Sequence, residues 1–363
     1  MKSVKSVNIF VLDVTLKGGI ERFCANLANS LVKKGMHVRV YSLHKTNDKP
    51  LYPINSSVEI FYISKFKFYN NFYKITTLYA CLLLRRMSFL FNENCKIIST
   101  HPITTILLNF LGFKMSNLIA SEHSSYESHG KLVCFLRKRA YKSVNAIVTQ
   151  TKSGYESFKS IGLESTTIYN STVNFSDSDQ WKYNTNENFL CLSVARVESV
   201  KQLHIILYIA KEIKSRGLPI TFAIVGDGSE KESLQHLSAK LGVSDMVTFY
   251  PATNDVFLYY KKAALYLITS KTESFSMTMT EALSYSVPVI SNGSLVGPSE
   301  VIINGLNGFL CKDNDVSEFS DLIEGVYRSA DLKRLKDASL RSAFRFNEDK
   351  VIDKWLALIN LTK

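Results

Sequence analysis

Two patterns of apolar and polar positions alternate along the chain. Short, mostly apolar runs predict buried strands, and between them apolar residues recur every three or four positions, as in amphipathic helices. The first run is Val7–Val14, and the helical pattern that follows it includes Phe23, Leu27 and Leu31. Such an alternation over a whole chain indicates helices packed on parallel sheets, an α/β fold.

The alternation forms two series separated by a polar segment. The first series contains seven strand candidates, which are Val7–Val14, His37–Leu43, Val58–Ile63, Lys96–Thr100, Asn117–Ser121, Ala146–Gln150 and Thr166–Asn170. The segment Ser171–Asn188 shows neither period, so we interpret it as a linker. The second series contains six candidates, which are Phe189–Val197, Ile220–Gly228, Met246–Tyr250, Ala264–Ser270, Pro288–Ser291 and Gly308–Lys312. The pattern predicts two doubly wound halves that face each other across a cleft.

The length of the chain agrees with two domains, because 363 residues exceed what a single hydrophobic core usually serves. We place an N-terminal domain at residues 1–172, a linker at 173–188 and a C-terminal domain at 189–344. Residues 345–363 follow one amphipathic pattern. We predict a helix there, packing back toward the N-terminal domain.

The net charge is unevenly distributed. The chain carries +12, and residues 1–180 hold 23 Lys and Arg against 11 Asp and Glu, whereas the remainder is balanced. A basic half indicates a polyanionic partner, which could be nucleic acid, an anionic membrane or a phosphate-bearing acceptor. Solvated surface lysines are the alternative interpretation.

One basic segment is also rich in aromatic residues. The segment Lys65–Phe91 interleaves Phe and Tyr side chains with Lys65, Lys67, Lys74, Arg85 and Arg86. Such a mixture suits a membrane interface, where rings lie at the depth of the headgroups and cations meet anionic lipid. A helix packed on the sheet with a cationic outer face would give the same pattern.

The cysteines and the apolar runs bear on the compartment. The six cysteines are scattered without a CxxC spacing, which is typical of a reducing compartment and of a chain without metal cluster or disulfide framework. The first apolar run is short and contains Asp13, unlike a signal peptide. No run approaches the roughly 20 apolar residues that a spanning helix needs. We therefore expect a cytoplasmic protein.

Gly18 and Gly19 lie where the first predicted strand gives way to a helix. Glycine permits positive φ and close backbone approach, and a helix N-terminus attracts anions. The turn therefore suggests a ligand that bears phosphate. An ordinary tight strand-to-helix turn is the alternative.

Two glutamates, Glu273 and Glu281, are separated by seven residues and precede a strand candidate. We predict Glu273 in the loop after the strand at 264–270 and Glu281 on the next helix. Ligands in open α/β sheets bind at the carboxyl ends of strands, so both carboxylates could face the cleft. Two solvated carboxylates are the alternative.

Other candidates also follow predicted strands. Arg196 and Lys201 follow the first strand of the second series, where fixed cations suit a pyrophosphate. Gly226 belongs to VGDG, which is not a complete dinucleotide fingerprint, and His123 follows a strand of the first series. The acidic motif at Asp177–Asp179 imitates a metal site, but we assign it to the polar linker and predict no metal site.

Taken in order, these features resemble family 4 of the retaining glycosyltransferases, which have the GT-B fold of two facing Rossmann-like domains. The features are GGIE at Gly18, the loop histidine His123, R-x4-K at Arg196, VGDG, the E-x7-E segment and GPSEVIINGLNGFL. The resemblance covers nearly the whole chain. It implies an enzyme without a metal or other cofactor that transfers a sugar from a nucleotide donor with retention of configuration.

The resemblance also implies residue roles. Arg196 and Lys201 would neutralise the diphosphate as it leaves, a task that needs preorganised positive charge. Glu273 would hold hydroxyls of the donor sugar, Glu281 would bind the ribose, and His123 would contact the donor sugar near the reacting carbon. The backbone of Gly18 and Gly19 would approach the donor diphosphate or the acceptor. The backbone of Gly226, Ser276 and Met277 would approach the donor.

The chain departs from the family pattern at several positions. Gln202, Ser274 and Ser286 stand where the family usually has glycine, and Ser276-Met277 replaces a common Gly or Pro. These substitutions bear on the backbone amides that approach the donor phosphates, and so on the choice of donor sugar.

The expected reaction moves a hexose or N-acetylhexosamine from a nucleotide sugar, which we take to be UDP-activated. The acceptor would be lipid-linked or a polysaccharide, in the assembly of capsule, O-antigen or exopolysaccharide. The enzyme would be cytoplasmic and peripheral on the anionic inner face of the cytoplasmic membrane, with no nucleic-acid partner. A sugar-nucleotide epimerase or phosphorylase of the same fold, and a basic nucleic-acid-binding protein, are the alternatives.

Overall fold

The computed structural model describes residues 6–68, 72–86, 95–124, 126, 129–172, 189–329 and 331–361. The chain forms two compact units. The N-terminal unit comprises residues 1–171 together with 348–363, and the C-terminal unit comprises residues 172–347. The predicted linker at 173–188, including Asp177–Asp179, lies outside the described residues.

The N-terminal unit is built on a parallel sheet of seven strands in the order β3-β2-β1-β4-β5-β6-β7. The strands are β1 (Ser6–Val11), β2 (His37–Ser42), β3 (Glu59–Tyr62), β4 (Cys95–Ser99), β5 (Leu118–Glu122), β6 (Ala146–Thr149) and β7 (Thr166–Thr167). Each lies within or beside a predicted strand. β1 ends earlier than predicted because Asp13 turns the chain, its carboxylate accepting hydrogen bonds from the backbone N–H groups of Thr15 (2.9 Å) and Thr46 (2.8 Å).

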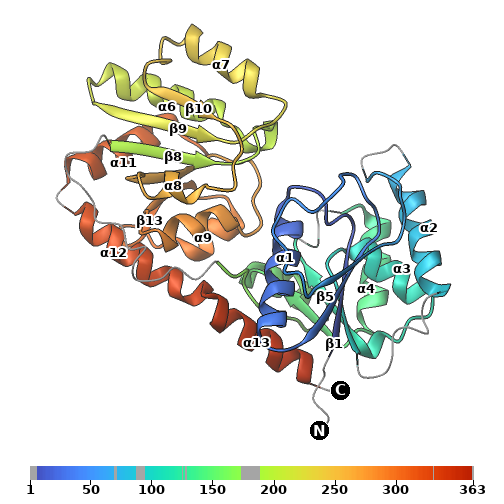
Figure 1. Cartoon of the computed structure of the whole chain (residues 1–363). Coiled ribbons are helices and arrows are strands. Elements are labelled where there is room, and N and C mark those ends of the chain that lie inside the picture. Colours follow the sequence, from blue (N-terminus) through green and yellow to red (C-terminus); the bar gives the residue numbers. More distant parts are fainter. Residues whose placement is uncertain are drawn as a thin grey trace. The chain divides into compact units, whose positions relative to one another are not determined.

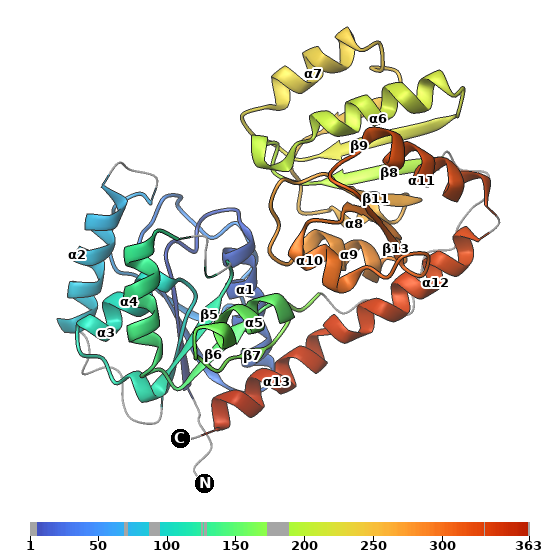
Figure 2. The ribbon, with the colours of Figure 1, turned by 180° about the vertical axis from the view of Figure 1, so that it is seen from behind.

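Helices cover both faces of this sheet (Figures 1 and 2). They are α1 (Gly19–Lys33), α2 (Tyr73–Arg86), α3 (Pro102–Phe110), the short η2 (Met115–Asn117), α4 (Lys131–Tyr141), α5 (Lys152–Ser160) and α13 (Glu348–Asn360). The core on one face joins α1 to α13, where the rings of Phe23 and Trp355 lie 5.9 Å apart. The core on the other face joins α2, α3, α4 and α5. The two faces follow the alternation of β1, because Ile9 belongs to the first core and Phe10 to the second.

The C-terminal helix differs from its prediction. We predicted a single helix over 345–363, whereas α13 begins at Glu348. Residues Phe344–Phe346 form a 3-10 turn, η6, and Asn347 is extended (φ −54°, ψ 138°), which separates the turn from the helix.

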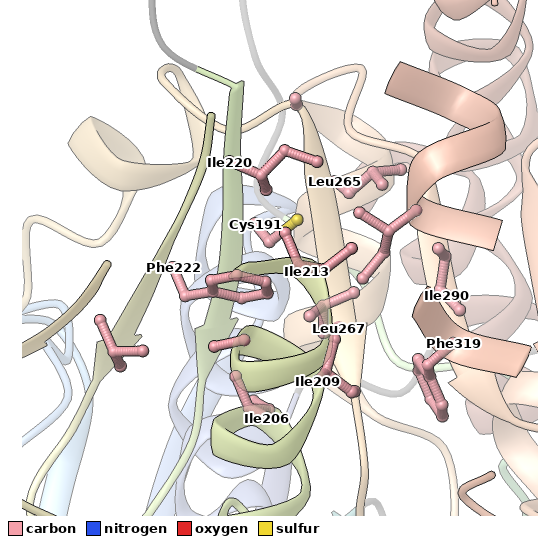
Figure 3. Close-up of a cluster of buried hydrophobic side chains, with 14 of the residues drawn as sticks. Cys191, Ile206, Ile209, Ile213, Ile220, Phe222, Leu265, Leu267, Ile290 and Phe319 are labelled. Carbon is pink, nitrogen blue, oxygen red and sulfur yellow. The ribbon is translucent and has the colours of Figure 1, made fainter. Parts of the chain in front are cut away.

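The C-terminal unit contains a parallel sheet of six strands in the order β10-β9-β8-β11-β12-β13. Its strands are β8 (Phe189–Val194), β9 (Ile220–Val225), β10 (Val247–Tyr250), β11 (Leu265–Ile268), β12 (Val289–Asn292) and β13 (Gly308–Cys311). Its helices are η5 (Ser199–Lys201), α6 (His204–Ser215), α7 (Lys231–Lys240), α8 (Phe257–Tyr260), α9 (Met277–Ser284), α10 (Val296–Val301), α11 (Val316–Arg328) and α12 (Leu332–Ala343). Figure 3 shows Ile206, Ile209 and Ile213 of α6 packed against the sheet, beside Phe222 and Leu267.

Both sheets have the same winding. The first strand of each unit, β1 or β8, lies inside the sheet, with the next two strands on one side and the fourth, β4 or β11, on the other. The crevice at the carboxyl ends of such a strand pair is where open α/β sheets bind ligands. The winding therefore predicts a ligand site at the β1/β4 edge of the N-terminal unit and another at the β8/β11 edge of the C-terminal unit.

Within the described ranges, no helix combines the length and the apolar character that crossing a bilayer requires.

Three of the departures from glycine keep a left-handed backbone. φ is 47° at Gln202, 66° at Ser276 and 61° at Ser286, a region that costs a side-chain-bearing residue about 1–2 kcal/mol. Ser274 does not share this conformation. At these three positions the chain thus keeps a backbone conformation that favours glycine, although the residues carry side chains.

Ser286→Gly is expected to raise the free energy of unfolding of the C-terminal unit by about 0.5–1 kcal/mol, because glycine removes the strain at φ 61° but loses more chain entropy on folding. Urea denaturation followed by circular dichroism measures the change. Ser233→Gly, at an exposed position inside α7, is the control and should lower stability by about 0.5 kcal/mol. Equal losses in both variants would contradict the strain at Ser286.

Candidate functional site

A pocket opens at the carboxyl edge of β8 and β11 in the C-terminal unit. Its lining includes Ser193 at the end of β8, Lys201 on η5, Thr269 and Glu273 after β11, and Ser276 at the start of α9. The pocket therefore occupies the point where the strand order reverses, as the winding predicts.

Lys201 and Glu273 form an ion pair in this pocket, with Nζ 2.5 Å from Oε2. Ser270 Oγ donates to the same carboxylate oxygen at 3.4 Å. The loop after β8 is tied to that after β11, because Thr269 Oγ1 donates to the carbonyl of Lys201 (3.0 Å). The two charged side chains are 19% and 18% exposed, so a ligand in the pocket can reach both.

The N-terminus of α9 supplies further groups. Ser276 is the N-cap residue, Met277 is the first helical residue, and Ser276 and Thr278 line the pocket. The first amides of a helix have no acceptor within it and attract anions. An ammonium, hydroxyls and helix-end amides at one edge can bind phosphate, while the Glu273 carboxylate can accept hydrogen bonds from sugar hydroxyls.

Four of the site residues predicted in the C-terminal unit lie outside the lining of this pocket, namely Arg196, Gly226, Met277 and Glu281. Glu281 is on α9, the helix predicted for it, but it is buried and accepts a hydrogen bond from the hydroxyl of Tyr260 at 3.2 Å. Arg196 is exposed on the loop after β8. The sequence predicts two cations and two carboxylates at this site. Of these four residues, the structure places Lys201 and Glu273 in contact.

Gly226 allows two loops to pack closely against each other. Its φ is 154°, and a Cβ there would lie 1.9 Å from the carbonyl oxygen of Ala195. A Cβ on Gly228 would lie 2.2 Å from the carbonyl oxygen of Val197. The glycines of VGDG thus let the loop after β9 pack on the loop that carries Arg196.

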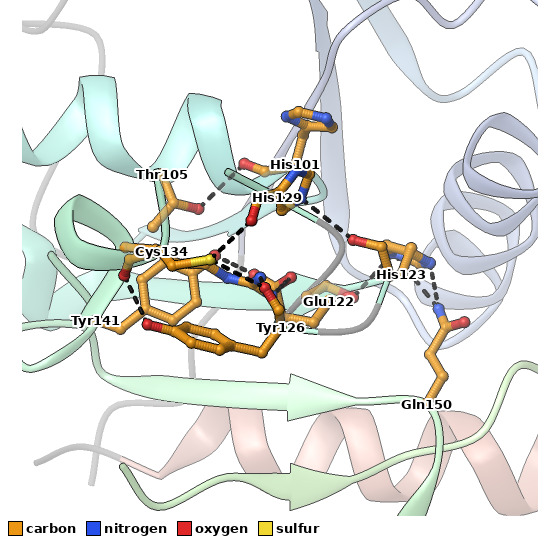
Figure 4. A network of polar contacts seen from close by, with 12 residues as sticks. His101, Thr105, Glu122, His123, Tyr126, His129, Cys134, Tyr141 and Gln150 are labelled. Carbon is orange, nitrogen blue, oxygen red and sulfur yellow. Dashed lines mark hydrogen bonds and ion pairs between the residues drawn. The ribbon is translucent and has the colours of Figure 1, made fainter. Parts of the chain in front are cut away.

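In the N-terminal unit, His123 follows β5 and is held by polar neighbours (Figure 4). Its Nδ1 lies against the side-chain amide of Gln150, and its Nε2 lies 3.2 Å from Ser121 Oγ. Asn170 donates to Gln150 Oε1 at 3.0 Å, which orients the Gln150 amide to donate to Nδ1. Gln150 and Asn170 therefore hold the imidazole of His123 in place.

The imidazole of His123 is partly buried. Its ring centroid is 4.4 Å from that of Phe23 on α1. Burial lowers the pKa of His123 to about 3, against the raising effect of the Gln150 hydrogen bond. His123 can therefore donate a hydrogen bond at neutral pH but does not carry charge.

A buried charged network lies directly before His123 in the chain. Glu122, at the end of β5, accepts hydrogen bonds from Arg137 Nη2 and from the hydroxyl of Tyr141, both on α4 (Figure 4). The side chains of Glu122 and Arg137 are 2% and 0% exposed. The Arg137 guanidinium also lies 5.0 Å from the ring centroids of Tyr126 and Phe158. This network fixes α4 to the strand that positions His123.

The structure corrects one part of the expectation for Gly18 and Gly19, the positive φ. Gly18 is the N-cap of α1 with an extended backbone (φ −149°, ψ 177°), and Gly19 is the first helical residue, so neither has positive φ. A Cβ on Gly18 would lie 2.4 Å from Oε2 of Glu21, whereas one on Gly19 would meet nothing within 4 Å. Gly18 therefore makes room for a carboxylate of the same helix.

Several supporting residues were missed from the sequence. Gln150 and Asn170 orient His123, and Asn314, which follows β13, donates to the carbonyl of Thr269 (2.8 Å) and to Gln202 Oε1 (3.1 Å). Gln150 and Asn170 end predicted strands and Asn314 follows one, so their place at the carboxyl edge was the available signal.

Two family models match this chain, and each covers most of one of the two units. Residues 17–172 match the family model described as Glycosyltransferase Family 4, and residues 175–340 match Glycosyl transferases group 1. An uncharacterized glycosyltransferase of Haemophilus influenzae is 25% identical over 98% of this chain and 100% of its own length. A Campylobacter jejuni α-1,4-N-acetyl-D-galactosaminyltransferase, named for an undecaprenol-diphosphate-linked acceptor, is 24% identical over 96% of this chain and 97% of its own.

Solved structures have the same fold. The lipopolysaccharide outer core galactosyltransferase WaaB superposes with a TM-score of 0.73 at 19% identity, covering 98% of this chain and 99% of its own. Anabaena HepE, solved with UDP and glucose, gives 0.74 at 15% identity over 97% and 99%. The protein is thus a glycosyltransferase enzyme with the GT-B fold.

Within that class, the chain belongs to glycosyltransferase family 4. The fold class and the enzyme class expected from the sequence are confirmed.

Proposed function

We propose that the protein is a retaining glycosyltransferase that moves a hexose or N-acetylhexosamine from a UDP-sugar, without a metal ion, to a lipid-linked or polysaccharide acceptor of a cell-surface glycan. The observation that carries the donor site is the Lys201–Glu273 pair beside the N-terminus of α9. Lys201 and the helix amides would bind the diphosphate, with Arg196 supplying further positive charge, and Glu273 would hold sugar hydroxyls. His123 would form a hydrogen bond with the donor sugar through its neutral imidazole.

Several relatives support the donor and the acceptor class. The HepE structures contain UDP, UDP with glucose, or UDP-glucose. The Campylobacter relative is named for N-acetylgalactosamine transfer to a lipid diphosphate, and Salmonella typhimurium lipopolysaccharide 1,6-galactosyltransferase is 37% identical over 26% of this chain. The basic N-terminal half agrees with an acceptor that bears phosphate and with attachment to the inner face of the cytoplasmic membrane.

A transfer assay tests the proposal. The purified chain is incubated with UDP-glucose, UDP-galactose, UDP-N-acetylglucosamine or UDP-N-acetylgalactosamine, a bacterial lipid extract and EDTA, and UDP release is measured. One donor is expected to be consumed, and NMR of the product should show the anomeric configuration of the donor. A product of inverted configuration, or transfer abolished by EDTA and restored by a divalent cation, would contradict retention or metal independence.

A further inference from the structure

The helices α2, α3 and α4 expose large apolar side chains. Eight of the eighteen exposed large apolar side chains in the described part of the chain lie on these three helices, and they are Ile75, Leu78, Tyr79, Leu82, Phe110, Leu132, Phe135 and Leu136. Phe110, Leu132 and Ile75 are 83%, 71% and 65% exposed. On α2 and on α4 these residues recur every three or four positions, so each helix presents an apolar stripe to solvent.

The stripes lie on one side of the N-terminal unit. The inner residues of α2, α3 and α4 belong to the same buried core, on the face of the sheet opposite α1 and α13. α3 packs against both α2 and α4, and Figure 2 shows the three helices in one layer. Their outward side chains therefore form a single surface, here called the α2–α4 face.

The charged side chains on α2, α3 and α4 are all positive. The sequences of α2, α3 and α4 contain no Asp or Glu. Arg85 and Arg86 end α2 and are exposed, and Lys131 and Arg139 on α4 are exposed as well. Exposed apolar stripes on helices that carry cations and no carboxylate are the composition that binds anionic lipid, because the stripes enter the headgroup region while the cations meet lipid phosphates.

α4 connects this face to the candidate active site. Its outer residues are Leu132, Phe135 and Leu136, while Arg137 and Tyr141 on its inner side hold Glu122, which directly precedes His123. A bilayer bound at α4 would thus lie against the helix that supports the histidine. An acceptor anchored in that bilayer would be kept beside the carboxyl edge of the sheet.

We propose that the α2–α4 face docks on the surface of an anionic lipid bilayer and so supplies a membrane-anchored acceptor to the His123 edge. The proposal rests on the proposed function for the nature of the acceptor, whereas the docking itself rests on exposure and charge. It extends the membrane contact expected for residues 65–91 to α3 and α4; residues 69–71 and 87–91 of that segment lie outside the described residues.

Vesicle flotation of the full chain tests the docking. The probes are phosphatidylcholine vesicles with and without phosphatidylglycerol. The wild type is expected to float with the anionic vesicles only, and less at high salt. Leu132→Ser/Phe135→Ser and, separately, Lys131→Glu/Arg139→Glu should each weaken binding at least about tenfold.

The matched control is Tyr208→Ser/Leu258→Ser, which changes two exposed apolar residues of the C-terminal unit and should leave flotation unchanged. Far-UV circular dichroism, together with the fluorescence of Trp355 in the core of the N-terminal unit, shows that each variant is folded. Flotation that is equal for neutral and anionic vesicles, or unchanged in both α4 variants, would overturn the proposal. Self-association of the wild type that both α4 variants abolish would assign the face to a second copy and overturn it too.

The two proposals fail separately. UDP binding without flotation would overturn the docking and leave the donor site standing. Flotation that depends on α4, in a folded protein that neither binds nor consumes any UDP-sugar, would support the docking and overturn the proposed function.

Discussion

Lys201→Ala is expected to lower kcat/KM for sugar transfer by about 10²–10³-fold. The ammonium forms the ion pair with Glu273 beside the N-terminus of α9, where negative charge would develop as the diphosphate leaves. Its removal takes preorganised positive charge from the transition state. Steady-state release of UDP with the preferred donor measures the effect.

Lys214→Ala is the control for this prediction. Lys214 lies in the same unit and also forms an ion pair, with Asp245 at 2.7 Å, but it does not line the pocket. This variant should keep kcat/KM within about twofold, because surface ion pairs contribute little. Equal activity of both variants would remove Lys201 from the mechanism.

Arg137→Met is expected to lower the free energy of unfolding of the N-terminal unit by about 3–5 kcal/mol. The substitution leaves the buried carboxylate of Glu122 without its charged partner, and it removes the guanidinium that lies 5.0 Å from the ring centroids of Tyr126 and Phe158. Burial already raises the pKa of Glu122, and Arg137 opposes that rise. Trp355, buried against α1, reports unfolding by fluorescence in a Trp181→Phe background.

Arg39→Met supplies the comparison within the same unit. Arg39 pairs with Glu59 at 3.0 Å, but both side chains are partly exposed, so the loss should be below about 1 kcal/mol. If Arg137→Met were no more destabilising than Arg39→Met, the Glu122 network would not hold α4 to β5 as described.

The sheets were predictable from the sequence because their strands are parallel and buried, and such strands appear as apolar runs. Each strand of the structure lies at a predicted run, yet the ends differ. Val7–Val14 is longer than β1 because the apolar residues Leu12 and Val14 continue past the point where Asp13 turns the chain. Apolar character alone does not show where hydrogen bonding to the neighbouring strand stops.

The candidate site was predictable only in part. Lys201 and Glu273 were each identified, but their pairing needs β8 and β11 to be neighbours, an order that local patterns do not specify. The burial of Glu281 under Tyr260 and the neutral state of His123 likewise depend on contacts between distant segments. Gln202, Ser276 and Ser286 have a left-handed backbone that their residue types do not indicate, whereas glycine at these positions would have suggested it.

Calorimetric titration of the purified chain with UDP tests the central claim most directly. Binding of one UDP per chain is expected in EDTA, weakened at least about tenfold by Lys201→Ala and unchanged by Lys214→Ala. That result would place a nucleotide diphosphate at the β8/β11 edge. A folded protein that binds no UDP, or that binds it equally well after Lys201→Ala, would contradict the donor site.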